Sequence, residues 1–337
     1  MSEEELAPIS YEDLAEIEDA FAEVDDEIMR RQYELSSSLY ARRAEAIAKI
    51  PSFWPLVLEQ APPEIEDYIT HRDSAVFAEH LVNLSITRPQ IEGGKNGNPR
   101  SVDITFEFSA NDYFEDTTLV KRCWYRRASD GWAGLVSEPV QIKWKKGKDL
   151  TDGLTDAAVD LWIARQKAGD SSAKDLPEYR ALEKKVENWN GANTSFFTWF
   201  GWVSGRRFVS IKESEKANAN YTARKKARKA GSKSDAEDID ESDVGEEEDD
   251  SAVEVHQYGE EIAASLAEDV WPNAIKFFTQ AQELDDNPEA DFEDSDLDGD
   301  NDSEGEDQPI DLRSLVQGKD KARSTESFGP ASKKQKT

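Results

Sequence analysis

The chain has 337 residues, of which 72 are acidic and 41 basic, and its formal net charge is −31. A charge of this size and sign repels nucleic acid and anionic membrane surfaces and attracts polycations, so basic proteins are the first class of partner to consider. One cysteine excludes an internal disulfide framework, and no apolar run approaches the roughly 20 residues of a membrane span. We therefore expect a chain of the cytosol or the nucleus.

The first predicted element is a long helix over residues 12–50 that ends before Pro51. Its large apolar side chains recur at helical spacing along one narrow stripe. They are Leu14, Ile17, Phe21, Val24, Ile28, Leu35 and Leu39. At 1.5 Å per residue such a helix is about 57 Å long, more than a small domain can cover. A narrow stripe normally pairs with a copy of itself, which predicts a homodimer. The alternative is a helix that lies on its own domain.

Residues 51–282 predict a folded α+β domain. Short helices are expected early in this domain, after which the period of the apolar residues changes from helical spacing to two. This alternation predicts an antiparallel sheet of about four strands, the first two joined by the turn-rich segment 91–99. The strands are expected around 84–86, at 102–108, at 117–127 and at 140–144.

Helical patterns return later in the chain, at 177–190, 194–202 and 258–282. Pro272 is expected to kink the last of these helices. The polar segment 210–254, first basic and then acidic, predicts an insertion without fixed structure. For the same reason we expect disorder at residues 1–11 and in the acidic tail 283–337. The fold class is thus α+β: a long dimerisation helix, then a sheet covered by helices, then an acidic tail.

The acidic residues gather in two runs, 235–250 and 277–312. The first run contains eleven acids and the second fifteen, and neither contains Lys or Arg. Without these 26 acids the net charge of the chain changes from −31 to −5, so the remainder can fold without strong self-repulsion. The charge is therefore predicted to be carried mainly on appendages of a nearly balanced domain.

No residue pattern in the sequence indicates catalysis. The histidines His71, His80 and His256 are scattered, and no group of cysteines and histidines has the spacing of a zinc site. The glycine-rich phosphate-binding motifs are absent as well. We therefore expect no enzyme activity, no metal and no cofactor.

Two short basic runs predict a nuclear-import address and hence an importin as a partner. The candidate residues are Lys225, Lys226, Arg228, Lys229, Lys333, Lys334 and Lys336. Contact of the run 223–229 with nucleic acid is the alternative, but the eleven acids of 235–250 would mask it, so we expect nucleic acid to be contacted only indirectly. The predicted location is the nucleus, with shuttling to the cytoplasm.

Three segments resemble the nucleosome assembly protein family, specifically its SET branch. They are IKWKKGKDLT at 142–151, SFFTWF at 195–200 and EDVWPNAIKFF at 268–278. The resemblance covers roughly 12–282, and the insertion at 210–254 is longer than expected for the branch. It implies a homodimeric histone chaperone in which paired long helices join two α+β domains. Some fungal members of the family partner a histone acetyltransferase, which extends the expectation to an accessory role in acetylation.

On this interpretation, fixed carboxylates of the α+β domain bind Arg and Lys side chains of core histones, either the tetramer-forming or the dimer-forming pair. The candidates are Asp112, Glu115, Asp116, Asp152, Asp156, Glu260, Glu261, Glu268 and Asp269. The alternative for each of them is an ordinary surface carboxylate. The rival function is an acidic regulator that inhibits an enzyme such as a phosphatase, with histone binding secondary.

Overall fold

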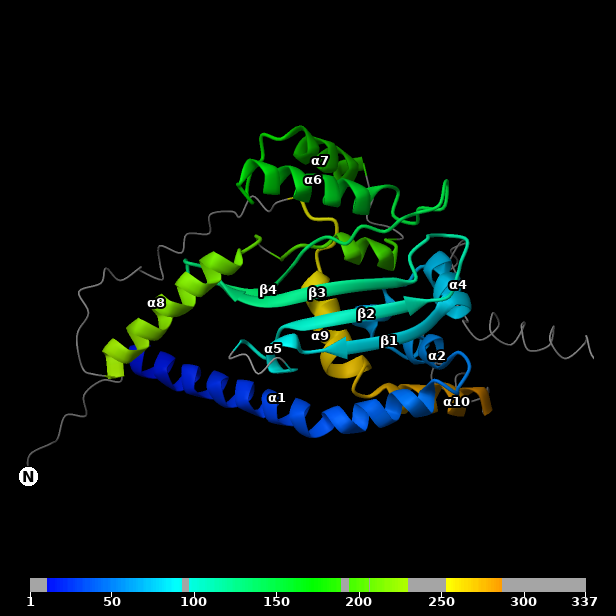
Figure 1. Ribbon diagram of the computed structural model, residues 1–337, viewed down its shortest axis with the longest axis horizontal. Helices are drawn as coiled ribbons and strands as arrows, with labels where there is room; N and C mark the ends of the chain where they lie inside the picture. Colours follow the sequence, from blue (N-terminus) through cyan, green and yellow to red (C-terminus); the bar gives the residue numbers. More distant parts are fainter. Residues whose placement is uncertain (1–10, 93–96, 189–193, 206, 230–252, 287–337) are drawn as a thin grey trace, which may run out of the picture.

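The computed structural model describes residues 11–92, 97–188, 194–205, 207–229 and 253–286. Helix α1 (Tyr11–Ile47) runs along one side of the molecule, and a four-stranded sheet with its surrounding helices lies beside it (Figure 1). The predicted long helix is confirmed. It contains no Gly or Pro, and it ends where Pro51 would remove a backbone donor.

The sheet is antiparallel, with the strands in sequence order. Its members are β1 (Leu81–Thr87), β2 (Val102–Phe108), β3 (Thr118–Arg127) and β4 (Ala133–Ser137). Alternate residues of β2 are buried, as the period of two predicted. The expected last strand at 140–144 is wrong, because the chain already reverses after β3 at Gly131, whose φ of 98° suits a tight turn. Trp144 retains a single bridge to Phe114.

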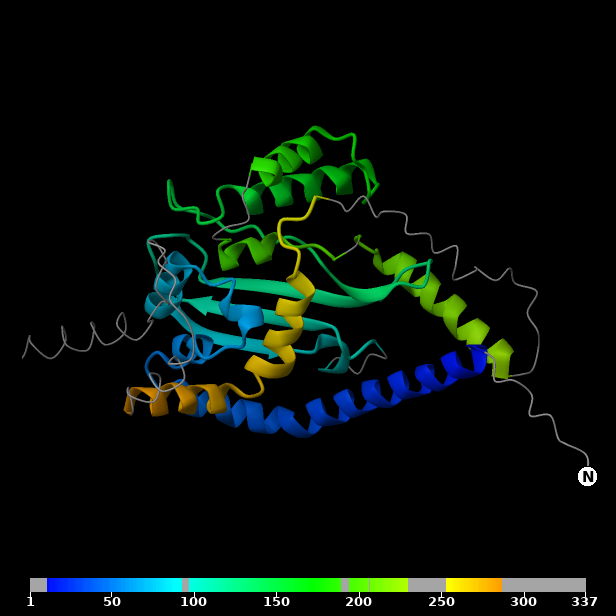
Figure 2. The same ribbon diagram turned by 180° about the vertical axis from the view of Figure 1, so that it is seen from behind.

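Helices gather on one face of the sheet, as the view from behind shows (Figure 2). The short helices before the sheet are α2 (Phe53–Glu59), α3 (Pro63–Glu66) and α4 (His71–His80), and α5 (Pro89–Glu92) follows β1. Phe53, Trp54 and Phe77 from these helices are buried in the core. The prediction of a sheet covered by helices is thereby confirmed.

The aromatic segment 195–200 lies at the centre of the core. Its residues make the 3-10 helix η1 (Phe196–Gly201), and the rings of Phe196, Trp199 and Phe200 pack around Phe106 of β2. Asp73 anchors this segment from α4, because its carboxylate accepts hydrogen bonds from Ser195 Oγ at 2.6 Å and from the Phe196 amide at 2.9 Å. The segment SFFTWF, one of the three through which the sequence resembles the family, therefore serves the packing of the core.

Helix α6 (Leu154–Ala168) was not predicted, whereas α7 (Pro177–Asn188) matches the helical pattern expected at 177–190. The two helices pack on each other through Leu161, Tyr179 and Leu182, with Val255 joining their cluster. The hairpin lies above β4 in Figure 1. Helix α6 also contacts Trp144, whose indole donates to Thr155 at 3.4 Å.

The predicted insertion without fixed structure at 210–254 is wrong for its first part. Residues 211–229 form helix α8 (Ile211–Lys229). The composition of α8 is rich in Ala, Lys and Arg, which are strong helix formers, and Ala217 is buried at its base. Residues 230–252 lie outside the described residues, as do residues 1–10 and 287–337 of the predicted disordered ends, 1–11 and 283–337. The remaining residues of those ends are helical, Tyr11 in α1 and 283–286 in the last helix.

The last predicted helix is divided at Pro272, as expected. Helix α9 (Gly259–Ser265) continues into a π-helical turn, η2 (Leu266–Val270), and α10 (Ala274–Asp286) follows. The Trp271 amide donates to the Leu266 carbonyl at 3.0 Å, which is the wider spacing of a π turn. Helix α10 extends four residues beyond 282, where the domain was expected to end.

Candidate functional site

The apolar stripe of α1 is exposed along its whole length. The seven residues predicted to form it are between 50% and 63% accessible, namely Leu14, Ile17, Phe21, Val24, Ile28, Leu35 and Leu39. On a protein surface, large apolar side chains gathered in this way mark an interface. We call these seven residues the seam.

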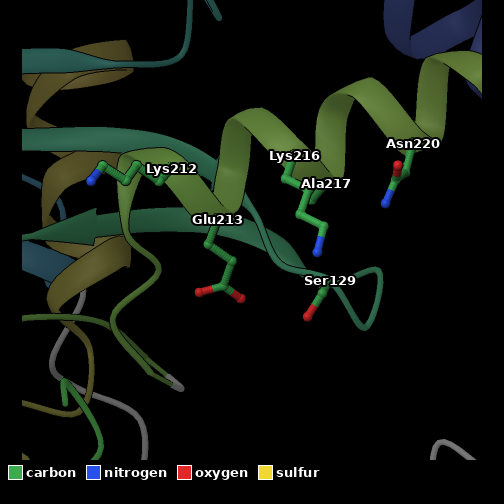
Figure 3. Close-up of a pocket in the computed structure, with 6 residues that line it drawn as sticks. All are labelled: Ser129, Lys212, Glu213, Lys216, Ala217 and Asn220. Atoms are coloured by element: carbon green, nitrogen blue, oxygen red, sulfur yellow. The ribbon is translucent and has the colours of Figure 1, made fainter. Parts of the chain in front are cut away.

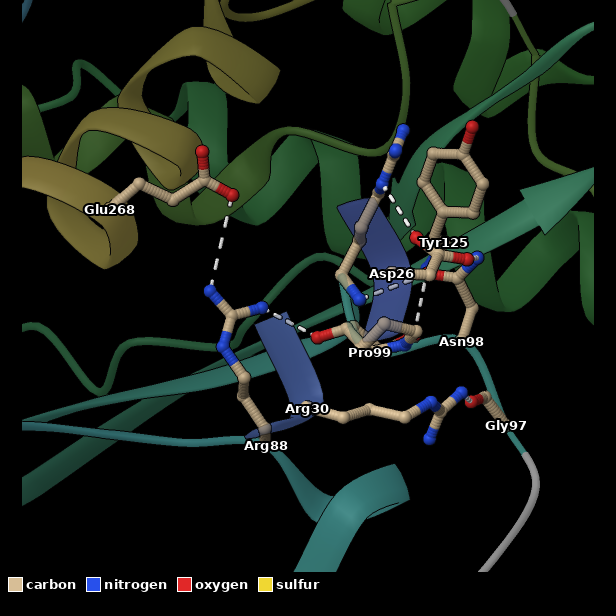
Figure 4. A network of polar contacts seen from close by, with 10 residues as sticks. Asp26, Arg30, Arg88, Gly97, Asn98, Pro99, Tyr125 and Glu268 are labelled. Carbon is tan, nitrogen blue, oxygen red and sulfur yellow. Dashed lines mark hydrogen bonds and ion pairs between the residues drawn. The ribbon is translucent and has the colours of Figure 1, made fainter. Parts of the chain in front are cut away.

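Polar residues on α1 join the helix to the α+β domain (Figure 4). Asp26 pairs with Arg100 at 3.2 Å, and Arg30 donates to the carbonyl of Gly97. The hydroxyl of Tyr33 donates to Glu92 at 2.5 Å and accepts from the Arg88 amide at 3.2 Å. We call this contact region the joint.

Arg88 lies at the centre of the joint and is only 7% exposed. Its guanidinium donates to the Pro99 carbonyl at 2.5 Å and lies 3.9 Å from the carboxylate of Glu268. Burial lowers the pKa of Arg88, and the nearby Glu268 carboxylate opposes that shift. The charge of Glu268 is thus partly committed to the buried guanidinium of Arg88.

The C-terminal part of α1 packs on the Pro272 division of the α9–α10 segment. The rings of Tyr40 and Trp271 are 4.2 Å apart, and the guanidinium of Arg43 lies 4.6 Å from the Trp271 ring. Arg43 also donates to the Trp271 carbonyl at 2.5 Å. The Trp271 carbonyl, at the division between η2 and α10, thereby has a side-chain donor from α1.

Charge is distributed unequally along α1. Residues 11–29 contain nine acids and no base, whereas residues 30–47 contain four arginines and two glutamates. One half of the helix is therefore strongly negative and the other moderately positive.

The first group of predicted histone-binding acids lies around the segment 141–145. Asp112 and Glu115 are exposed in the loop before β3, and Asp116 is half-buried. Asp116 accepts a hydrogen bond from the Lys143 amide at 2.7 Å, and its carboxylate lies 3.8 Å from the Lys143 ammonium. Asp112 and Glu115 thus remain more open to a partner than Asp116.

Asp152 and Asp156 flank the same segment at the start of α6. Asp156 accepts from Gln141 at 2.7 Å and is exposed. Asp152 is exposed with a positive φ of 51°, and its carbonyl accepts from Lys185 at 3.2 Å. The structure thus brings Asp112, Glu115, Asp116 and Asp156 to the loops around 141–145, whereas Asp152 contacts Lys185 of α7.

The other four acids lie apart from the first group, on α9 and the π turn. Glu260 is half-buried and accepts from the Leu135 amide of β4 at 2.9 Å, and burial raises its pKa. Glu261 and Glu268 are exposed, and Asp269 accepts from the Asn273 side chain at 2.8 Å. Glu260 stabilises the contact between α9 and β4, so it is less accessible to a histone than the sequence suggested.

The basic residues predicted as a nuclear-import address also differ in exposure. Lys225 is held by Glu23 of α1 at 2.5 Å and is 16% exposed, whereas Lys226 is exposed. Arg228 and Lys229 belong to the last turn of α8, and their side chains are not described. The terminal candidates Lys333, Lys334 and Lys336 lie outside the described residues.

A hollow of about 420 Å³ lies between α8 and the turn that follows β3 (Figure 3). Its lining residues are Ser129, Lys212, Glu213, Lys216, Ala217 and Asn220. Glu213 is paired with Arg207 at 2.7 Å. Across the described ranges, no group of three or more His, Cys, Asp and Glu side chains could hold a metal ion. None of the helices described is both long and apolar enough to span a membrane.

The model of the family described as nucleosome assembly protein (NAP) matches residues 4–281. A Schizosaccharomyces pombe protein named as a nucleosome assembly protein is 29% identical over 81% of this chain and 80% of its own length. NAP1-related protein 2 of Arabidopsis thaliana is 26% identical over 86% of this chain and 80% of its own length. Among solved structures, Ccp1 matches 81% of this chain and 95% of its own, with 26% identity and a TM-score of 0.47. Vps75 matches 80% of this chain and 96% of its own, with 19% identity and a TM-score of 0.48.

Proposed function

Because this chain belongs to the nucleosome assembly protein family, we propose that it is a dimeric nuclear histone chaperone that binds core histones and catalyses no reaction. The observation that carries the proposal is the family match over 4–281, which spans the described part of the chain up to the middle of α10. The charge, the seam and the exposed acids supply the physical mechanism.

Charge supports a basic partner. The net charge of −31 is concentrated in 235–250 and 277–312, so these segments attract polycations from a distance. Asp112 and Glu115 are exposed in the loop before β3 and Asp156 is exposed on α6, and each can meet an Arg or Lys side chain of a partner. The acid-rich segments thus supply capture, and the domain supplies orientation.

The seam supports a second copy of this chain as its occupant. At about 1.5–3 kcal/mol for each large apolar side chain removed from water, fourteen such side chains in a dimer supply ample stabilisation. The charge pattern of α1 also fits pairing with itself. In an antiparallel arrangement the acids of 11–29 lie beside the exposed Arg31 and Arg42 of the other copy, because Arg30 and Arg43 are engaged by the domain of their own copy. We therefore infer antiparallel pairing of the two α1 helices.

The carboxylates proposed to bind histones are exposed, which suits a chaperone because it must release the histone again. Contacts between exposed charges are weak individually and are screened by salt, so they exchange rapidly. A histone held in this way can pass to DNA, whose phosphates compete for the same Arg and Lys side chains. An acetyltransferase and an importin as further partners remain predictions of the sequence.

A titration tests the proposal. Each labelled core-histone pair is titrated into the full chain and into a 1–286 truncation at about 0.15 M and about 0.5 M salt, with an unrelated basic protein of equal charge as the control. At the lower salt concentration the Debye length is about 8 Å, and at the higher one it is about half that value. We expect the truncation to retain histone binding at the higher salt, with loss of binding to the control protein.

The opposite result has a clear meaning. If binding to both histone pairs and to the control protein disappears equally with salt or with removal of 287–337, the chain is only a polyanion. An acidic regulator of an enzyme then becomes the better description, and an inhibition assay on the truncation would test it.

A further inference from the structure

Helix α8 connects two parts of the molecule that are distant in sequence. It starts beside the end of β3 and extends to the N-terminal half of α1, as both views show (Figures 1 and 2). The sequence predicted no structure here, so α8 had no role in the expected architecture.

The base of α8 is fixed to the sheet. Ser214 Oγ accepts a hydrogen bond from the Arg127 amide at 3.1 Å, and Ala217 is buried. The guanidinium of Arg127 lies 4.0 Å from the centre of the Tyr221 ring, a cation–π distance. Ser214, Ala217 and Tyr221 are three and four residues apart and therefore share one face of the helix.

The far end of α8 is fixed to α1. The hydroxyl of Tyr221 donates to the carboxylate of Asp19, and the ammonium of Lys225 donates to Glu23 at 2.5 Å. Tyr221 and Lys225 are four residues apart, as are Asp19 and Glu23, so one face of each helix meets the other. Burial is the main cause that raises the pKa of Tyr221 to about 12, and the carboxylates of Asp19 and Glu23 act in the same direction. The phenol therefore remains a hydrogen-bond donor.

Charge favours this contact along its length. Five of the six residues at 224–229 are basic, and residues 11–29 of α1 contain nine acids and no base. Within the described residues, the polar contacts of the joint begin only at Asp26. The stretch of α1 that carries Leu14, Ile17 and Phe21 is thus held to the domain by α8.

We propose that α8 is a bracing arm that fixes the N-terminal half of α1 against the domain and so preorganises the seam for the second copy. Tyr221 and Lys225 are its positioning residues, and the surface they bind is the Asp19–Glu23 face of α1. This proposal rests on the proposed dimer, because the seam has a use only if a second copy binds it.

The size of the effect follows from population arithmetic. An apparent dissociation constant rises as the binding-competent fraction falls, and both copies of a homodimer must be competent. If loss of the arm reduces the competent fraction to about one third, the dissociation constant of the dimer rises by about tenfold. The effect should shrink as salt weakens the ion pair at Lys225.

The test compares two variants of the full chain. Tyr221→Phe with Lys225→Ala removes the two contacts with α1 and keeps the ring that stacks on Arg127. The matched control, Lys226→Ala, removes the same charge from an exposed neighbour of Lys225. The dimer dissociation constant of each is measured by dilution in sedimentation or subunit exchange, and amide hydrogen exchange is followed over 14–24.

We expect the double variant to weaken the dimer by about tenfold and to speed exchange over 14–24, with little change for Lys226→Ala. Reversal of the pair, Glu23→Lys with Lys225→Glu, should restore part of the affinity that Lys225→Glu alone removes. Unchanged exchange over 14–24 in the double variant would overturn the bracing arm.

The two proposals fail in different ways. If the unmodified chain is a monomer at all concentrations, the dimer proposal fails, and the bracing of α1 is still decided by hydrogen exchange. If the dimer forms and the double variant dimerises as tightly as the control, α8 does not preorganise the seam.

Discussion

His256 is a buried residue with an unusual environment for its type. It is 2% exposed, its ring lies 4.7 Å from that of Tyr68, and neither ring nitrogen has a hydrogen-bond partner among the described residues. Burial lowers the pKa of His256 to about 4, and the charge of Lys121 contributes in the same direction. The neutral ring therefore belongs to the core just before α9.

Acid should destabilise the protein through this residue. Between pH 6.5 and pH 4 the unfolded chain binds a proton at His256 that the folded chain does not, so the free energy of unfolding falls as pH falls. At pH 5 the contribution is about 2 kcal/mol relative to pH 8. His256→Phe keeps an aromatic ring beside Tyr68 and removes the proton-binding nitrogens. We expect it to reduce the loss of stability between pH 8 and pH 5 by that amount, measured by urea unfolding.

A second variant keeps that experiment specific. His80 and Glu79 lie near the surface, and His80→Phe removes another imidazole without touching the core around His256. An equal dependence of stability on pH in the unmodified chain and in His256→Phe would show that His256 is not the acid-sensitive group.

Single residues were predictable from the sequence to the extent that polarity determined their position. The burial of Phe196, Phe197 and Trp199 followed from their composition alone. Lys121 could not be placed in the same way, although it alternates with Leu119 and Cys123 on the inner face of β3. Its ammonium is buried because the carbonyls of Glu138, Phe200 and Trp202 accept from it, and these lie far away in the sequence.

At the scale of the element, α1 serves two purposes with different faces. Asp26, Tyr33 and Arg43 hold it to the domain, while the seam is left exposed. The helical period separates the two sets of residues, so a change in the seam need not disturb the joint.

Charge placed in the seam should separate the two copies. Ile17→Asp with Phe21→Asp replaces two exposed apolar side chains, 52% and 63% accessible, in each copy. Each contributes about 1.5–3 kcal/mol when buried, so four substitutions per dimer remove about 6–12 kcal/mol of apolar burial. They also place four unpaired carboxylates in the interface, which costs further free energy. We expect a monomer-sized mass by light scattering at micromolar concentration, with an unchanged circular dichroism spectrum.

Val82→Asp is the matched control for this variant. Val82 is an apolar residue on β1 with 61% exposure, outside the seam. A dimer-sized mass for Ile17→Asp with Phe21→Asp would remove the seam from the interface.

Helices and strands were predicted correctly where the periodicity of apolar residues was long. The prediction failed where a local signal competed with that periodicity. The helical spacing over the 37 residues of α1 and the alternation in β2 and β3 were sufficient to predict these elements. The fourth strand was misplaced because the turn at Gly131 outweighs the apolar alternation at 140–144. Helix α8 was missed because its charge suggested a solvated segment, while its partners are the acids of α1, about 200 residues earlier.

At the scale of the whole molecule, the uneven distribution of charge should govern the rate of histone capture. The run 277–312 holds fifteen acids, most of them beyond the end of α10 at Asp286. Electrostatic steering raises association rates, and the gain is lost as salt increases. We expect removal of 287–337 to slow histone association severalfold at low salt and to change it little at about 0.5 M.

Stopped-flow mixing with labelled histones measures this difference directly. The dissociation rate should be much less affected than the association rate, since the domain retains its own carboxylates. Equal association rates for the full chain and for the 1–286 truncation at low salt would show that the tail has no part in capture.

The whole architecture was predictable from the sequence only as a class. A long helix, an antiparallel sheet and covering helices followed from periodicity, but the joint between α1 and the domain did not. Arg88, Arg100 and Glu268 come from three separate parts of the chain, and no local pattern marks them as neighbours. The candidate acids were found by type, and their division into two groups depends on tertiary packing.

The charge pattern of α1 also has a consequence for the choice of partner in a cell that makes several related chains. A helix with an acidic first half and a basic second half is complementary to its own reversed copy. Against a relative whose halves carry the same sign throughout, half of the contact would be repulsive, and specificity is such a difference between affinities. An apolar stripe alone would pair with any other apolar stripe, so we expect the order of charges along α1 to favour pairing with its own copy.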